Sequence, residues 1–161
     1  MLVDLMTKKV LFNRKMTKPL DQLLIFLAAG NGPTDPIRIM KGMFVFSRAV
    51  AEGKLPKMET FDFEAMNYGP CSLQVYEALD CLVEKGLAKA VDVPGESWKR
   101  FAITKLGADV VEPLAGDKVG DFLKKLRAWC DGQSFTGLLR AVYHAYPEFA
   151  VNSVLPHLRP N

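Results

Sequence analysis

The chain has 161 residues, of which 49% are hydrophobic and 24% are charged. This balance matches that of soluble globular domains and excludes a wholly disordered chain. The 21 lysines and arginines only slightly outnumber the 18 acidic residues, and a formal net charge of +3 is too small by itself to indicate a nucleic-acid-binding protein. A chain of this length can form one domain whose core needs no disulfide or metal.

The few cysteines and histidines favour a protein of a reducing compartment. Cys71, Cys81 and Cys130 form no Cys-x-x-Cys pair, and neither His144 nor His157 has a cysteine at metal-ligand spacing. We therefore predict no metal, no cofactor and a cytoplasmic location. The chain also has no apolar run of the roughly 18 residues that cross a membrane, and its first residues do not resemble a secretory signal.

Charge is distributed unevenly along the chain. Residues 1–20 carry five cations and one acid, whereas residues 61–86 carry five acids and one lysine. We interpret residues 1–16 as a basic N-terminal arm of the kind that flanks DNA-binding modules. A solvated tail is the alternative interpretation. The residues that would contact phosphates are Lys8, Lys9, Arg14 and Lys15.

The first predicted helix follows this arm. It begins at Pro19, with Thr17 as its capping residue, and it ends before the turn sequence at residues 30–33. Leucines recur at helical spacing on one side, and Ile25 and Phe26 fill much of the other. We therefore expect protein to surround nearly the whole helix.

A second helix is predicted to follow its capping residue Asp35 and to end at about Glu52. Gly42 within it would allow another helix to cross closely. The helix carries more apolar residues than one face can bury. Phe44 and Val45 therefore have two interpretations: a surface for a partner or for a second copy of the chain, or, as we favour, a surface that the C-terminal helices cover.

The middle of the chain predicts an extended stretch and a third helix. Apolar and polar residues alternate over residues 61–66, which indicates a short strand, and a turn is expected at residues 67–70. The third helix is predicted over residues 73–85, with Ser72 as its cap and with Tyr76 among its inward residues. Its outward residues include Gln74, Glu77 and Glu84.

Two strand-like runs follow, at residues 87–93 and 98–103, and a Pro-Gly connection joins them. A short connection of this kind predicts a β-hairpin. Lys99 and Arg100 lie just past the turn and Lys89 lies on the partner strand, so the hairpin could rest on a phosphate backbone. A solvated hairpin tip is the alternative.

Further helices are predicted over residues 105–111, 117–131 and 134–146. Trp129 and Phe135 occupy positions at core spacing, and we expect both to face inward. His144 is interpreted as a half-buried structural residue rather than a catalytic one. We expect these helices to dock on the first part of the chain, because only a short stretch connects the two parts.

The order helix, helix, strand, helix, hairpin is typical of a winged helix-turn-helix domain. We predict a mainly α fold with a small β-hairpin, in which C-terminal helices pack on a winged helix-turn-helix core. The expected domains are the arm (1–16), the winged helix (17–104) and a C-terminal helical extension (105–161).

The sequence also resembles a known family. The motif Tyr68-Gly69-Pro70, followed by a helix of the form Ser-x-x-Val-Tyr-x-x-Leu-x-x-Leu, is similar to the corresponding segment of the Panacea antitoxin domain. It is also similar to that of related uncharacterised winged-helix proteins described as predicted transcriptional regulators. The resemblance implies a non-enzymatic module that binds DNA or a protein partner, such as a toxin or a chaperone.

Two functions are compatible with these features. The first is a non-enzymatic regulator that binds double-stranded DNA through the basic arm and the hairpin. Against it, the third helix would enter the major groove with Glu77 and Glu84 outward, where they would repel phosphates. The second is an antitoxin-like protein–protein interaction module that uses Gln74, Glu77 and Glu84. We predict no catalytic residue, because the chain has no glycine-rich phosphate loop and no His-Glu-x-x-His sequence.

Overall fold

The structure, a computed structural model, describes residues 17–161. Within them the fold is mainly helical, with two small antiparallel strand pairs. This agrees with the prediction of a mainly α fold that contains a small β-hairpin. The helices and strands are α2 (Pro19–Ala28), α3 (Pro36–Ala51), β1 (Glu64–Met66), β2 (Gly69–Cys71), α4 (Leu73–Glu84), β3 (Ala88–Asp92), β4 (Lys99–Ile103), α5 (Lys105–Val111), α6 (Lys118–Asp131) and α7 (Phe135–Ala145), with short 3-10 turns at Glu112–Leu114, Pro147–Phe149 and Pro156–Leu158.

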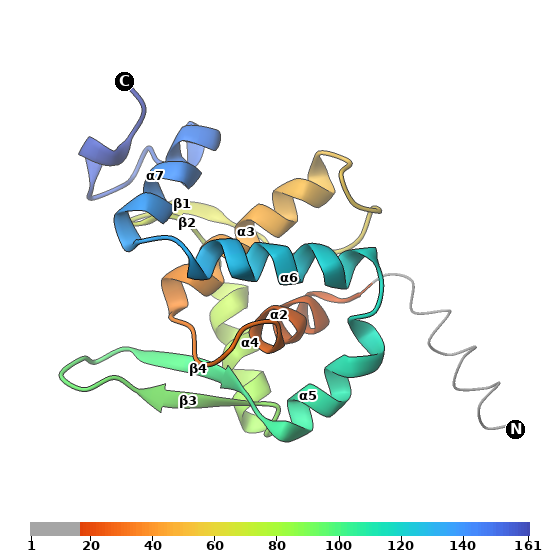
Figure 1. Ribbon diagram of the computed structural model, residues 1–161. Coiled ribbons are helices and arrows are strands. Elements are labelled where there is room, and N and C mark those ends of the chain that lie inside the picture. Colours follow the sequence, from red (N-terminus) through yellow and green to blue (C-terminus); the bar gives the residue numbers. More distant parts are fainter. Residues whose placement is uncertain (1–16) are drawn as a thin grey trace, which may run out of the picture.

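Helix α2 lies at the centre of the molecule. Its residues from Gln22 to Leu27 are buried, and helices α3, α4, α5 and α6 all pack against it (Figure 1). Gly42 of α3 lies against the Phe26 ring, where a Cβ atom would come within 2.5 Å of a ring carbon. The predictions that protein surrounds this helix and that Gly42 permits a close crossing are both confirmed.

Polar side chains cap the helices at most of the predicted positions. Asp35 accepts a hydrogen bond from the Arg38 backbone N–H at 2.9 Å, and Ser72 caps α4 in the same way. The prediction that Thr17 caps α2 is wrong. Because Pro19 begins the helix, the capping position falls on Lys18, and the Thr17 hydroxyl instead contacts the sulfur of Met58 at 3.7 Å.

The β1–β2 pair differs from the prediction of a strand over residues 61–66 and a turn over residues 67–70. Only Glu64–Met66 forms β1, and Gly69 and Pro70 belong to β2 instead of the turn. Proline is tolerated there because a two-stranded pair leaves one side of each strand without a hydrogen-bonding partner strand. Gly69 has a φ of +85°, which glycine adopts without strain.

The β3–β4 hairpin forms where the sequence predicts it and extends away from the helices (Figure 1). One residue of the α2–α3 connection adds to it: Thr34 and Phe101 exchange two backbone hydrogen bonds of 2.9 Å each. The connection between the first two helices is therefore tied to the second strand of the hairpin.

The C-terminal helices pack on the first part of the chain, as expected. Helix α6 lies on α2 and α3, and α7 lies on α3, so that one hydrophobic core runs from Leu23 to Val142. Phe44 is fully buried under the rings of Phe63, Tyr146 and Phe149, which rules it out as a surface for a partner or a second copy. No helix within residues 17–161 has both the length and the apolar character needed to cross a membrane.

Several aromatic residues face outward against expectation. Tyr76, Trp129 and Phe135 are each about two-fifths exposed (44%, 39% and 40%). Each lies at the margin of its apolar stripe, where the distance to the neighbouring helix decides burial. On α7 the aromatic residue that is fully buried is Tyr143, and the adjacent His144 is exposed rather than half-buried.

A buried arginine closes the carbonyl end of α2. The Arg127 guanidinium of α6 donates to the carbonyl oxygens of Phe26, Leu27 and Gly32 at 2.8 to 3.0 Å, and its Nε donates to Asp131. Only 1% of the residue is exposed. These bonds add donors to the last carbonyls of α2 and to one in the α2–α3 connection, so Arg127 joins α6 to the end of α2.

Candidate interaction site

Three of the seven predicted DNA contacts, all in the β3–β4 hairpin, can be placed. The arm lies outside the described residues, while the hairpin cations are all exposed. Lys89 and Arg100 fall on one face of the hairpin, and Lys99 lies on the other face directly opposite Asp92, with 3.4 Å between its Nζ and the carboxylate. The three hairpin cations are therefore divided between the two faces of the β3–β4 hairpin and do not form one basic surface. The arm residues that stay untested are Lys8, Lys9, Arg14 and Lys15.

Arg100 stands beside two more arginines, Arg38 and Arg127, in a hollow of about 530 Å³ between the α2–α3 connection, β4 and α6. Arg38 is bonded to the carbonyl oxygens of Cys130 and Gln133, and Arg127 is bonded to the end of α2. Among the described residues, Arg100 alone of the three has no such bond. The hollow thus offers one uncommitted guanidinium to a phosphate.

Helix α4 turns an acidic and partly apolar side outward. Leu73, Tyr76, Glu77, Asp80 and Glu84 recur at spacings of three or four, which places them along one side, and all five are exposed. Within residues 17–161, none of these three carboxylates forms a salt bridge. This side of α4 would repel a phosphate backbone and would attract a positively charged surface.

Gln74 has a structural role in addition to the partner contact expected of it. Its Oε1 accepts a hydrogen bond of 2.9 Å from the Asp62 backbone N–H, and its Nε2 donates to the Asp62 carboxylate at 3.3 Å. The pair fixes the segment before β1 to the start of α4. Glu77 and Glu84 are therefore the freer members of the predicted contact set.

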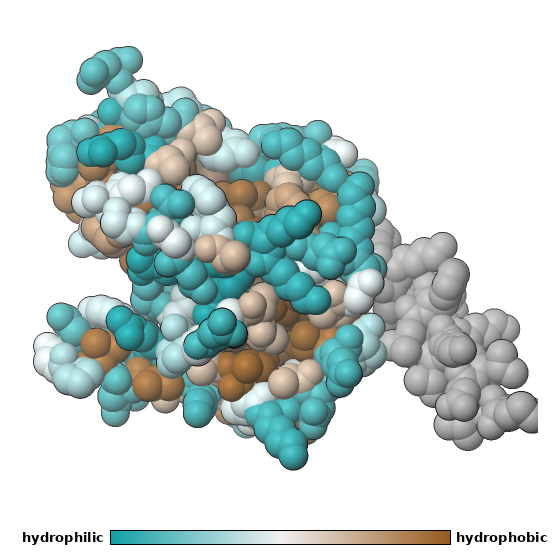
Figure 2. Space-filling view, in the orientation of Figure 1, coloured by the Kyte–Doolittle hydropathy of each residue, from teal (hydrophilic) through white to brown (hydrophobic). Residues whose placement is uncertain are grey.

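Exposed apolar side chains gather next to the acidic side. Met66 and Tyr68 lie at the β1–β2 turn, and the Tyr68 ring packs on that of Phe135, with centroids 6.1 Å apart. With Leu73 and Tyr76 of α4, these side chains are 39% to 68% exposed. We call the set the α4–hairpin face, where the hairpin meant is the β1–β2 pair; its residues are Met66, Tyr68, Leu73, Tyr76 and Phe135. Figure 2, which looks onto α6, α5 and the β3–β4 hairpin, shows apolar surface only in separate patches between charged side chains.

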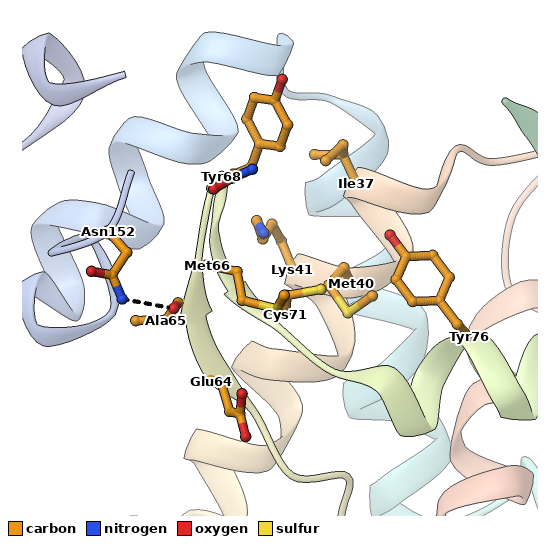
Figure 3. Close-up of a pocket in the computed structure, with 11 residues that line it drawn as sticks. Ile37, Met40, Lys41, Glu64, Ala65, Met66, Tyr68, Cys71, Tyr76 and Asn152 are labelled. Carbon is orange, nitrogen blue, oxygen red and sulfur yellow. Dashed lines mark hydrogen bonds between the residues drawn. The ribbon is translucent and has the colours of Figure 1, made fainter. Parts of the chain in front are cut away.

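A groove of about 520 Å³ opens within the α4–hairpin face, between α3, the β1–β2 pair and α4 (Figure 3). Its apolar walls come from Ile37, Met40, Met66 and the two tyrosines, Tyr68 and Tyr76. Lys41 also lines it. Figure 3 shows this side chain reaching from α3 toward the β1–β2 pair. We call this feature the Lys41 groove.

Lys41 is the residue with the most unusual environment. It is 1% exposed, and its Nζ donates a hydrogen bond of 2.8 Å to the Pro70 carbonyl oxygen. Burial lowers the pKa of the amine from 10.5 to about 8, and the neighbouring Cys71 partly opposes this shift. Sequence analysis missed Lys41, because helical spacing places it outside the two apolar rows of its helix, where a lysine is expected to be solvated.

The C-terminal segment holds the groove in place. The Asn152 side chain donates to the Ala65 carbonyl oxygen at 3.0 Å (Figure 3). The Val154 backbone N–H donates to the Asn67 carbonyl oxygen at 2.9 Å. The Tyr143 hydroxyl is hydrogen-bonded to Ser153 at 2.7 Å. The β1–β2 pair is therefore clamped between α3 and the C-terminal segment.

The described part of the chain holds no cluster of three or more histidine, cysteine, aspartate or glutamate side chains that could bind a metal ion. Cys71, Cys81 and Cys130 are free thiols. Burial raises the pKa of the Cys130 thiol to about 12, so that this thiol is protonated at neutral pH.

The burial of Lys41 predicts how stability depends on pH. The amine has a lower pKa in the folded chain than in the unfolded chain, so the unfolded chain binds more protons between pH 8 and 10.5 and stability rises across that window. We expect the wild type to gain about 2 kcal/mol relative to Lys41→Met between pH ~7.5 and pH ~9.5. Urea unfolding at both pH values measures this gain. An unchanged difference between the two proteins would show that the buried amine is not the cause.

No protein-family model matches the sequence, and no curated protein matches it either. The resemblance of the Tyr68-Gly69-Pro70 segment to the Panacea antitoxin domain therefore stays a prediction.

Proposed function

We propose that the protein is a non-enzymatic winged-helix module that binds a basic protein partner through α4 and the α4–hairpin face. The observation that carries the proposal is the outward side of α4, where Leu73 and Tyr76 lie next to carboxylates that form no salt bridge within residues 17–161. Exposed aromatic and aliphatic side chains with charges around them are typical of interaction surfaces.

The order of elements supports the winged-helix part of this proposal. Helices α2, α3 and α4 precede the β3–β4 hairpin, and the bridge between Thr34 and Phe101 adds the short first strand that joins such a wing to the helices. The connection between α3 and α4 differs from that of a DNA-binding helix-turn-helix. Residues 52–72, with the β1–β2 pair, separate α3 from α4, where a helix-turn-helix has a turn of three or four residues.

The chemistry of α4 defines the partner. Glu77, Asp80 and Glu84 favour a surface rich in lysine or arginine, and Leu73 and Tyr76 favour an apolar anchor within it. An antitoxin-like role, which the resemblance implies, is compatible with a partner of this chemistry.

DNA binding is the second candidate. It is favoured by Lys89 and Arg100 on one face of the β3–β4 hairpin and by the basic sequence of the arm. It is disfavoured by the acidic outward side of α4, the helix that would enter the groove.

The test is an affinity pull-down from the native cell, in which the amount of bound partner is compared between the wild-type chain and two double variants. Glu77→Lys/Glu84→Lys reverses the acidic side of α4, and Asp109→Lys/Glu112→Lys makes the same charge change at exposed positions on and after α5. We expect the first variant to lose at least about tenfold in captured partner and the second to match the wild type. Circular dichroism checks that both variants fold.

Nuclease treatment of parallel samples separates the two candidates. A captured basic protein that survives nuclease and disappears with the α4 reversal supports the protein-interaction module. The opposite result is capture that requires intact nucleic acid and that becomes stronger in Glu77→Lys/Glu84→Lys. It would contradict the protein-interaction module and favour DNA binding.

A further inference from the structure

The Lys41 groove contains a buried lysine amine that has no counter-ion among the residues the structure describes. A protonated lysine amine has three N–H donors, and in the described structure Lys41 uses one of them, toward the Pro70 carbonyl oxygen. Within residues 17–161 no carboxylate forms a salt bridge with it. A buried charge without a partner is costly, and such groups in a cleft mark ligand sites more often than chance.

The groove around this amine has the size and lining of a small-molecule site. Its volume of about 520 Å³ lies within the range of such pockets, and its walls are mainly apolar. The one acidic side chain that lines it, Glu64, lies farther along β1 and points away from Lys41 (Figure 3). Tyr68, Tyr76 and Asn67, which carry polar groups, also line it.

We propose that the Lys41 groove binds a small apolar monocarboxylate, with the carboxylate oxygen paired to the Lys41 amine and the apolar body between Met66 and Tyr76. A carboxylate accepts the two N–H donors that Pro70 leaves free. A neutral ligand would leave the charge unpaired, and a cation would be repelled. A phosphate would bring a second negative charge for which the lining residues supply no second cation.

The site goes beyond the proposed function, because a small molecule and not a protein occupies it. A ligand there would lie directly beside Tyr68 and Tyr76 of the α4–hairpin face. Its binding can therefore be measured on the purified protein with no partner present.

The experiment measures binding of matched acid and amide pairs by isothermal titration at pH ~7, where most of the amine is protonated. The probes are 4-phenylbutyrate with 4-phenylbutanamide, and hexanoate with hexanamide. We expect each acid to bind the wild type at least about tenfold more tightly than its amide. Lys41→Met should bind acid and amide equally, while keeping a cooperative thermal unfolding transition.

Two further variants make the outcome decisive. Met66→Glu adds a carboxylate at an exposed position of the groove wall and should weaken acid binding more than amide binding without affecting the fold, so the test does not depend on Lys41→Met alone. Glu77→Lys/Glu84→Lys should bind the acids like the wild type, which separates this site from partner capture. Absence of acid binding, equal binding of acid and amide to the wild type, or an acid preference that survives Lys41→Met would each overturn the proposal.

Discussion

Replacing Arg127 with methionine is expected to destabilise the fold by about 4 kcal/mol. Methionine keeps most of the side-chain volume, but it removes the donor to the carbonyl oxygens of Phe26, Leu27 and Gly32. The Phe26 oxygen keeps only a 3.3 Å bond from the Ala29 N–H, and the buried Leu27 oxygen loses its guanidinium partner. Each buried acceptor without a partner costs about 1 to 3 kcal/mol. Urea unfolding at neutral pH measures the loss.

Arg140→Met is the matched control, because Arg140 is an arginine on the exposed side of α7. We expect this change to alter stability by no more than about 0.5 kcal/mol. Similar losses in both variants would mean that the bonds of Arg127 to α2 contribute little beyond the loss of a positive charge.

Replacing Gly69 with alanine is expected to cost about 3 kcal/mol. The φ of +85° is strained for alanine, and the added Cβ atom would lie 2.5 Å from a ring carbon of the fully buried Tyr143. The ring would have to move, and with it the hydrogen bond to Ser153 that helps to clamp the β1–β2 pair. Thermal and urea unfolding measure the cost.

Gly95→Ala separates the two contributions. Gly95 has a φ of +79°, and no atom lies within 4 Å of the position of its missing Cβ, so only backbone strain of about 1 to 2 kcal/mol is expected. If Gly69→Ala costs no more than Gly95→Ala, the contact with Tyr143 is not a constraint on the β1–β2 pair.

The sequence predicts the helices well, because their signals are local. Capping residues such as Asp35 and Ser72, and glycines such as Gly53 and Gly86 after the helix ends, act within a few residues of the boundary they mark. The β3–β4 hairpin is equally local. Strand β2 was missed because Gly69-Pro70 has turn chemistry, and its pairing depends on packing against α7, far along the chain.

The site depends on information that the sequence does not carry locally. The acidic side of α4 could be predicted, because the spacing of Glu77 and Glu84 alone places both on the same face of the helix. The exposure of Tyr76 could not be predicted, since it depends on how residues of α3 and the β1–β2 pair, distant in sequence, lie around it. The environment of Lys41 is set by β2 and the C-terminal segment, so helical periodicity gives no sign of it.

The central position of α2 affects how the chain folds during translation. Its closing bonds come from Arg127, 101 positions after Phe26, so the most apolar helix emerges from the ribosome well before α6 can cover it. At ordinary translation rates this interval lasts about 5 to 20 seconds. We therefore expect the nascent chain to need protection by chaperones until synthesis has passed α6, and folding to be completed late in synthesis rather than step by step.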